Sequence, residues 1–177
     1  PAERRERLAR INSESSLILG DNDKAREYYE EFSRKEMNRK DYFYAGSVLY
    51  SVHDYHGAIE NYTCMADRSD SLGQIANYHL GNAYVHTRNQ VAAMAAFYEA
   101  SNVDFDPQIT EDAAFNYAKL ALDLNKDTRG FTRYIERWST RKRGNAIYSY
   151  MALAALYDRD YAGAVAAYDN IDDLSPD

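Results

Sequence analysis

One feature of the sequence recurs along its whole length: a small residue followed four positions later by an aromatic ring. The pair occurs five times, at intervals of 33 to 37 residues, as Ala25/Tyr29, Ala58/Tyr62, Ala93/Phe97, Gly130/Tyr134 and Ala164/Tyr168. Residues four apart lie on the same face of an α-helix. Each pair therefore indicates a helix that approaches a neighbouring helix closely at the small residue and carries a ring beside that contact. The sequence therefore predicts an array of five helical units, and no segment is predicted to form a strand.

A second helical pattern precedes each pair. In the third unit Leu80, Gly81 and Tyr84 come before the pair, and Pro107 follows it. The chain thus resembles the tetratricopeptide repeat (TPR) family, whose pattern of about 34 residues runs W-x2-L-G-x2-Y, then A-x3-F, then P. Asn77 stands in the first aromatic slot of this unit and departs from the pattern.

The resemblance implies an all-α fold, a right-handed TPR solenoid of about five helix-turn-helix repeats. Residues 1–177 form a single array with repeats near 6–38, 39–73, 74–110, 111–144 and 145–177, and we expect it to be a fragment of a longer chain. Helices are expected near 6–18, 22–37, 40–52, 55–68, 73–87, 89–102, 110–124, 128–139, 145–157 and 160–172. Thr110 is expected to cap the helix that opens at Glu111.

The first repeat is the most divergent, because only Ala9, Ser13 and Ser16 fill the slots before its pair. Two interpretations stay open for this segment, an atypical capping unit or a helix shifted in register. The turns within the repeats are expected at short polar pairs, which are Asp21-Asn22, His53-Asp54, Arg88-Asn89, Lys126-Asp127 and Arg159-Asp160.

Close packing within each repeat is expected from small residues on both helices, because helix axes approach most closely where side chains are small. The expected contacts are Gly46 with Ala58, Gly81 with Ala93, Ala118 with Gly130, and Ala152 with Ala164. The rings Tyr62, Phe97 and Tyr134 are expected to fill the core beside them.

Charge and composition exclude several classes of partner. The 177 residues contain 21 basic and 28 acidic side chains, a net charge of −7, which opposes binding to nucleic acid and to anionic lipid. The longest apolar run is shorter than the roughly 18 residues that indicate a membrane-spanning helix, so no membrane insertion is expected. The single cysteine, Cys64, has no partner for an internal disulfide.

Catalytic motifs are not found in the sequence, which has no glycine-rich phosphate loop, no G-x-S-x-G and no H-E-x-x-H. The four histidines, His53, His56, His79 and His86, are expected to be solvated or to cap helices rather than to bind metal. We therefore expect no enzyme activity, no cofactor and no metal site. The basic stripe Arg129, Arg133, Arg137 and Arg141–Arg143 is expected to pair with Glu136 and nearby carboxylates rather than to bind an anion.

The TPR resemblance further implies that the first helix of each repeat lines a concave groove that holds a peptide or a partner segment. The corresponding positions here are Phe43, Ser47, Tyr50, Tyr78, Asn82, Val85, His86, Phe115, Lys119 and Leu122. Phe43, Tyr78 and Phe115 would form a ladder of rings, with Ser47, Asn82 and Lys119 as a parallel polar row. The ladder fits an apolar, partly hydrogen-bonding partner, and it equally fits rings that only fill the repeat.

Two functions follow as hypotheses. The first is a non-enzymatic scaffold for protein–protein interaction that binds a peptide or partner segment in the groove. The alternative is a structural assembly segment whose groove is filled by neighbouring repeats or by a second copy of the chain. Self-association through the exposed terminal repeats is a separate expectation. A ligand sensor that uses the basic stripe is a third. Residues 100–120 resemble a junction in many-repeat TPR proteins of Gram-negative envelopes, which favours a periplasmic over a cytoplasmic location.

Overall fold

The computed structural model describes residues 2–32, 37–65, 69–138, 143 and 145–171. These residues form helices and turns with no strand, so the predicted all-α class is confirmed. The helices are α1 (Ala2–Ile18), α2 (Asn22–Phe32), α3 (Arg39–Ser51), α4 (Tyr55–Thr63), α5 (Ser71–His86), α6 (Gln90–Ser101), α7 (Pro107–Asn125), α8 (Arg129–Trp138), α9 (Asn145–Tyr157) and α10 (Tyr161–Tyr168). The expected helix ends at 33–36, 66–68, 139 and 172 lie outside the described residues.

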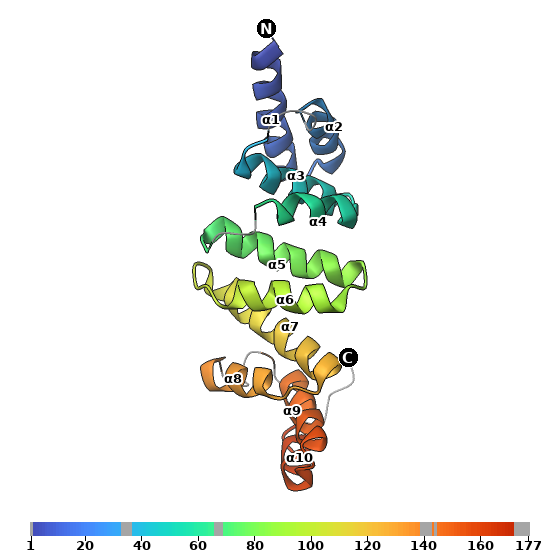
Figure 1. The fold of residues 1–177 in the computed structure, drawn as a ribbon, viewed down its shortest axis with the longest axis vertical. Helices are drawn as coiled ribbons and strands as arrows, with labels where there is room; N and C mark the ends of the chain where they lie inside the picture. Colours follow the sequence, from blue (N-terminus) through green and yellow to red (C-terminus); the bar gives the residue numbers. More distant parts are fainter. Residues whose placement is uncertain (1, 33–36, 66–68, 139–142, 144, 172–177) are drawn as a thin grey trace.

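The helices succeed one another along the long axis of an elongated molecule, with α1 and α10 at opposite ends (Figure 1). Consecutive helices from α1 to α8 pack together, as do α9 and α10, and α3 also packs on α1, α5 on α3, and α7 on α5. Between α8 and α9, the rings of Phe131 and Tyr150 are in contact. The buried side chains form three clusters along the array, which contain Tyr62, Phe97 and Tyr134 respectively. These rings therefore lie in the core, as the sequence predicted.

Each unit reverses direction at a residue in the left-handed backbone conformation. These residues are Gly20, His53, Arg88, Lys126 and Arg159, with φ of 78°, 64°, 61°, 57° and 60°. The next residue is always Asp or Asn, and its side-chain oxygen accepts a backbone N–H at the start of the following helix. A left-handed residue closes a helix and Asp or Asn opens the next one. Four predicted turn positions are thus confirmed, whereas the first turn lies at Gly20-Asp21, one residue before the expected pair Asp21-Asn22.

The close contacts within the units only partly follow the sequence prediction. A Cβ on Gly130 would lie 2.8 Å from Ala118 Cα, which confirms the contact of these two helices. A Cβ on Gly46 would instead meet the Tyr62 ring at 2.8 Å, and one on Gly81 the Phe97 ring at 2.6 Å. The atoms nearest to these two glycines thus belong to a ring that lies one turn beyond the expected partners, Ala58 and Ala93, on the second helix.

The start of α7 also differs from the expectation. The helix begins at Pro107, and Asp106 caps it by accepting the backbone N–H groups of Gln108 and Ile109. Proline suits the first helical position because its missing N–H has no helical partner there. Thr110 is therefore not the cap but a buried residue of the helix, whose hydroxyl donates to the Asp106 carbonyl over 2.9 Å.

The first unit contains a full helix, α1, which extends further toward the N-terminus than expected. Ala9, Ser13 and Ser16 are buried in it, at the slots that the repeat pattern assigned. The Ser13 hydroxyl donates to the Ala25 carbonyl over 2.8 Å. At this position α1 and α2 thus meet through a polar contact, whereas the helices of the other units meet there through small or apolar side chains.

The joints between units are fixed by one long polar side chain near the start of α3, α5 and α7. Arg39 donates to the Met65 carbonyl at 3.0 and 3.1 Å. Gln74 donates to the Val103 carbonyl at 2.8 Å and accepts the Asp106 N–H at 2.8 Å. Glu111 accepts from Arg143 at 2.9 Å. Each of these side chains connects its own unit to the loop that follows the unit's second helix.

Candidate functional site

Two helices in the middle of the array, α5 and α7, pack against each other, and each carries a stripe of mostly polar side chains. Tyr78, Asn82 and Val85 are spaced along α5 at helical intervals, and Asp112, Asn116 and Lys119 are spaced likewise along α7. Residues at these intervals share one helix face. We call the seam between these two faces the groove, and one cavity lies toward each of its ends.

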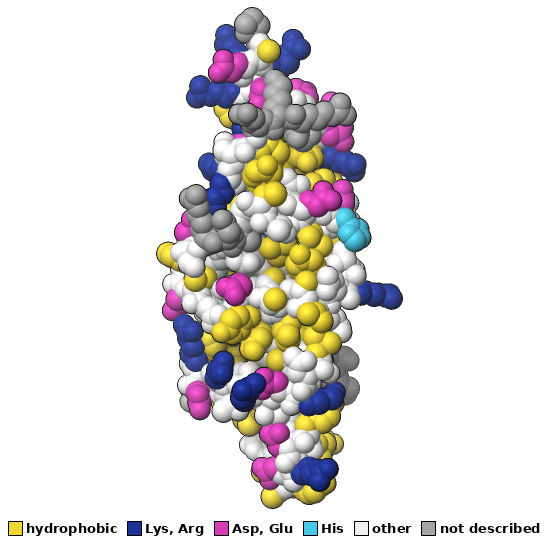
Figure 2. Space-filling model, viewed as in Figure 1, with side chains coloured by type: hydrophobic (Ala, Val, Ile, Leu, Met, Phe, Trp, Pro, Cys, Tyr) yellow, Lys and Arg dark blue, Asp and Glu magenta, His cyan; other side chains and the backbone are white. Residues whose placement is uncertain are grey.

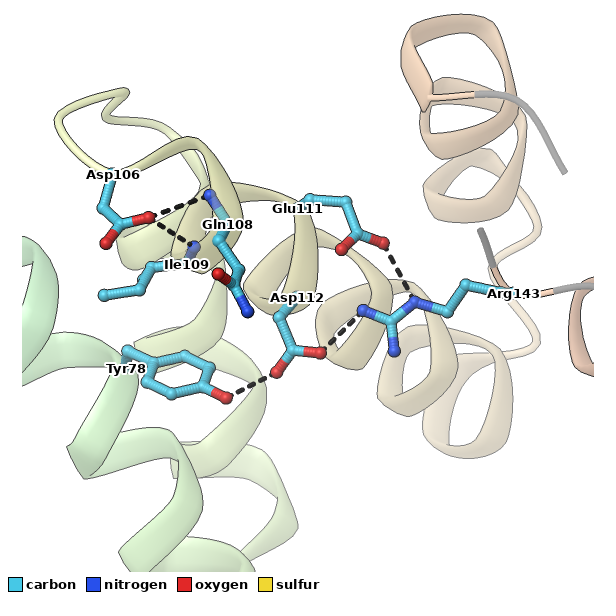
Figure 3. A pocket seen from close by; sticks show the side chains of 7 residues that line it. All are labelled: Tyr78, Asp106, Gln108, Ile109, Glu111, Asp112 and Arg143. Atoms are coloured by element: carbon cyan, nitrogen blue, oxygen red, sulfur yellow. Dashed lines mark hydrogen bonds and ion pairs between the residues drawn. The ribbon is translucent and has the colours of Figure 1, made fainter. Parts of the chain in front are cut away.

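The first cavity, of about 510 Å³, lies beside the first turns of α7 and the middle of α5 (Figure 3). Its lining residues are Tyr78, Asp106, Gln108, Ile109, Glu111, Asp112 and Arg143. The Tyr78 hydroxyl donates to Asp112 over 2.5 Å, and Arg143 donates to the other oxygen of Asp112 over 2.6 Å. The lining thus holds three carboxyl groups and one guanidinium, which pairs with Glu111 and Asp112 but not with Asp106, so this end of the groove is acidic.

Two side chains of this cavity, Tyr78 and Arg143, keep their protons near neutral pH. Burial, together with the hydrogen bond to Asp112, raises the pKa of Tyr78 to about 12, so the hydroxyl stays protonated near neutral pH. Burial acts to lower the pKa of Arg143, but the hydrogen bonds to Glu111, Asp112 and Tyr134 outweigh it and raise that pKa above its ordinary value. Side chains whose protonation does not change near neutral pH are better suited to bind a polar segment than to transfer protons.

The second cavity, of about 610 Å³, lies toward the C-terminal ends of the same two helices. It is lined by Val85, Arg88, Gln90, Phe97, Asn116, Lys119, Leu120 and Asp123. Phe97 and Leu120 are buried, whereas Arg88 and Asp123 are exposed. The cavity therefore combines an apolar floor with a rim that carries both signs of charge.

Four of the residues expected in the groove lie along it. Tyr78 lines the first cavity, while Val85 and Lys119 line the second. Asn82 lies between them on α5, and its side-chain amide donates to the Tyr78 carbonyl one turn earlier, at 3.1 Å.

Phe115 and Leu122 are not accessible, which corrects the expectation for both. They are buried, and Phe115 packs against Phe131, Tyr134 and Tyr150 with ring centroids 5.6 to 6.0 Å apart. The Arg143 guanidinium covers the remaining face at 4.2 Å. Phe115 meets rings from both α8 and α9, so it fills the core instead of continuing a ladder of exposed rings.

Phe43 and Ser47 belong to the packing of the second unit. Phe43 is half-buried, with its ring 6.2 Å from that of Tyr62. The Ser47 hydroxyl is hydrogen-bonded to the Phe43 carbonyl and to the Tyr62 hydroxyl, each at 2.9 Å. Both side chains therefore have structural partners, and neither lines the two cavities described above.

Tyr50 and His86 lie together near the within-unit turns, away from the two cavities. His86 is exposed and stacks on Tyr55 at 4.1 Å, while the Tyr50 ring meets both. The expectation that all four histidines are solvated or capping is wrong for His79. Its ring is stacked on Tyr62 at 5.5 Å, and burial lowers its pKa.

The sequence analysis did not select Asp112, Asn116 or Asp123 for the groove. Their spacing along α7, together with Lys119, is a polar stripe on a mostly apolar helix and is the signal that identifies them. Arg143 carries no such signal, because it reaches the first cavity from the loop before α9.

Arginines of the basic stripe pair with carboxylates among the residues that the structure describes. Arg129 bonds Asp127 at 2.8 Å and Arg137 bonds Asp104 at 3.0 Å. Arg133 and Arg137 also line a smaller cavity of about 260 Å³ beside Trp138. Arg141 and Lys142 lie outside the described residues.

A comparison of the sequence with protein-family models finds no match, and a comparison with curated proteins finds none either. Within the described part of the chain, no group of histidine, cysteine and carboxylate side chains is arranged to hold a metal ion. The same residues include no helix with the length and apolarity that crossing a membrane requires.

Proposed function

We propose that the chain is a TPR-type solenoid and a non-enzymatic scaffold that binds an extended protein segment in the groove between α5 and α7. Three observations support the solenoid. The same turn recurs in every unit, the helices form five pairs, and the buried side chains are divided among three clusters along the array. The observation that carries the function is the pair of cavities along one α5–α7 seam, because polar side chains from both helices converge on them.

The two cavities fit side chains of different chemistry. The first, whose lining has three carboxyl groups and one guanidinium, suits a basic or hydrogen-bond-donating side chain. The second, with Phe97 and Leu120 at its floor, suits an apolar side chain whose neighbours are polar. This revises the expected partner from a largely apolar segment to a mixed one.

The distance along the groove gives the spacing of these two side chains. Tyr78 and Val85 are seven residues apart on α5, which corresponds to about 10 Å of helix. An extended chain covers that length in about three residues at roughly 3.3 Å each. We therefore expect a basic residue and an apolar residue about three positions apart in the bound segment.

Selection from a phage-displayed library of random peptides tests this proposal. We expect enriched peptides that bind the wild-type chain and lose at least tenfold in affinity for Lys119→Glu with Asn116→Ala, a cost of about 1.4 kcal/mol. Arg133→Glu on α8 is the matched control, since it makes the same charge change at an exposed position outside the groove. Peptides that bind the groove variant as tightly as the wild type would contradict the proposal.

A further inference from the structure

The last helix, α10, exposes rings and side chains that are buried at the same positions of other units. Tyr168 follows Ala164 by four residues, as Tyr134 follows Gly130. Tyr134 is 1% exposed, whereas Tyr168 is 70% exposed. Val165 is likewise 60% exposed, although its counterpart Phe131 is buried. This face of α10 therefore lacks the cover that the corresponding face of α8 has.

In the interior of the array, the cover comes from the first helix of the next unit. On α9, Ile147 is buried in the cluster that contains Phe131 and Tyr134, and Tyr150 stacks on Phe131 at 5.0 Å. On α5, Ala76 lies in the cluster around Tyr62, and His79 stacks on that ring. Two positions three residues apart on a first helix thus cover the second helix before it.

The same two positions on α1 are Leu8 and Ile11. In the repeat pattern, Ala9 and Asn12 correspond to Asn77 and Leu80. The residues directly before them, Leu8 and Ile11, therefore correspond to Ala76 and His79. Both are apolar and exposed, Leu8 by 50% and Ile11 by 48%. The chain therefore carries an unused covering face on α1 and an uncovered face on α10, at opposite ends of the molecule (Figure 1).

The two ends also differ in charge. Residues 2–10 contain four arginines and two glutamates, and Lys and Arg side chains gather at this end of the surface (Figure 2). Residues 145–171 contain three aspartates and one arginine. We propose that α1 of one copy of this chain docks on α10 of a second copy, so that Leu8 and Ile11 cover Val165 and Tyr168. The opposite charges favour this head-to-tail orientation over contacts between like ends.

Such a contact joins two different surfaces and leaves a free face at each end of the assembly. Association is then open-ended and increases with concentration, unlike a symmetric dimer that closes on itself. The interface is separate from the α5–α7 groove, so the outcome of its test does not depend on the proposed peptide binding.

Analytical ultracentrifugation of the 177-residue chain over a range of concentrations tests the proposal with two double variants. Leu8→Glu with Ile11→Glu blocks the α1 face, and Val165→Glu with Tyr168→Glu blocks the α10 face. We expect the wild type to form dimers and larger species, and each double variant alone to be monomeric with an unchanged circular dichroism spectrum. A mixture of the two variants retains one good face on each partner and should form a dimer that grows no further.

Val91→Glu on α6 is the matched control, because it introduces the same charge at an exposed apolar position away from both ends. It should associate as the wild type does. A wild-type chain that is monomeric at every concentration would overturn the proposal. An α1-blocked variant that still dimerises would overturn it too, since that result indicates contact between two α10 faces.

Discussion

Gly81 on α5 lies against the ring of Phe97 on α6, so closely that a Cβ on the glycine would stand 2.6 Å from the ring. Phe97 is buried and its ring is also near Tyr78, at a centroid distance of 6.1 Å. The ring therefore cannot move aside without disturbing the groove face of α5. The same relationship joins Gly46 and Tyr62, so this contact sets the spacing of the helices in two consecutive units.

The first prediction concerns this contact. Gly81→Ala should lower the free energy of unfolding by about 1–3 kcal/mol, because the added methyl group overpacks the site, and Gly81→Leu should lower it further. Urea denaturation measures the change. Ala95→Leu, at an exposed position of α6, should stay within about 0.5 kcal/mol of the wild type. Equal stability of Gly81→Ala and the wild type would show that the helices do not meet in this way.

The second prediction separates core rings from groove side chains. Phe115→Ala and Phe97→Ala should each lower the unfolding free energy by about 3–5 kcal/mol, because both rings are buried. Val85→Ala, at an exposed groove position, should change stability by less than about 0.5 kcal/mol. Thermal melts of the three variants provide the comparison, and a Phe115→Ala melt like that of Val85→Ala would place Phe115 at the surface.

The third prediction concerns the joint between α6 and α7. Gln74→Leu removes the amide that bonds the Val103 carbonyl and the Asp106 N–H, and leaves these groups without that partner. These two hydrogen bonds are partly buried, and each contributes about 0.5–1.5 kcal/mol, so the unfolding free energy should fall by about 1–3 kcal/mol. Gln108→Leu, one residue after Pro107 on an exposed surface, is the control. If both variants unfold at the same urea concentration, the joint is not stabilised by Gln74.

The fourth prediction is a pH dependence that comes from His79. Burial lowers the pKa of His79 below its ordinary value of 6.5, so the folded state binds this proton less readily than the unfolded state. Its contribution to stability is complete above pH 6.5 and is lost as the pH falls through the lower, folded-state pKa. Replacing His79 with leucine should flatten the stability profile below pH 6.5, whereas His56→Leu, at an exposed position, should not. An unchanged profile in His79→Leu would assign the acid sensitivity to other groups.

The sequence predicted those features that depend on neighbouring residues. Turns followed from short polar pairs such as His53-Asp54 and Arg88-Asn89, because the cap and the left-handed residue act locally. The burial of Tyr62, Phe97 and Tyr134 followed from a repeated spacing, and only part of the groove, on α5 and at Lys119, followed in the same way.

Features that depend on distant contacts were not predicted. Phe115 occupies the same register as Tyr78, yet α8 and α9 bring two more rings and Arg143 against it. Such an arrangement is not encoded in the spacing of residues along one helix. The start of α7 is a different case, because Asp106 as the cap and Pro107 at the first helical position are a local signal, which the repeat pattern assigns to the joint between units.

The most direct test of the proposed function is a nuclear magnetic resonance titration of the chain with a library-selected peptide. We expect the side-chain amide resonances of Asn82 and Asn116, which lie on the two sides of the groove, to shift in proportion to occupancy. The amide resonances of Asn61 on α4 and Asn170 after α10 should stay in place. Shifts confined to Asn61 or Asn170, with those of Asn82 and Asn116 unchanged, would contradict binding between α5 and α7.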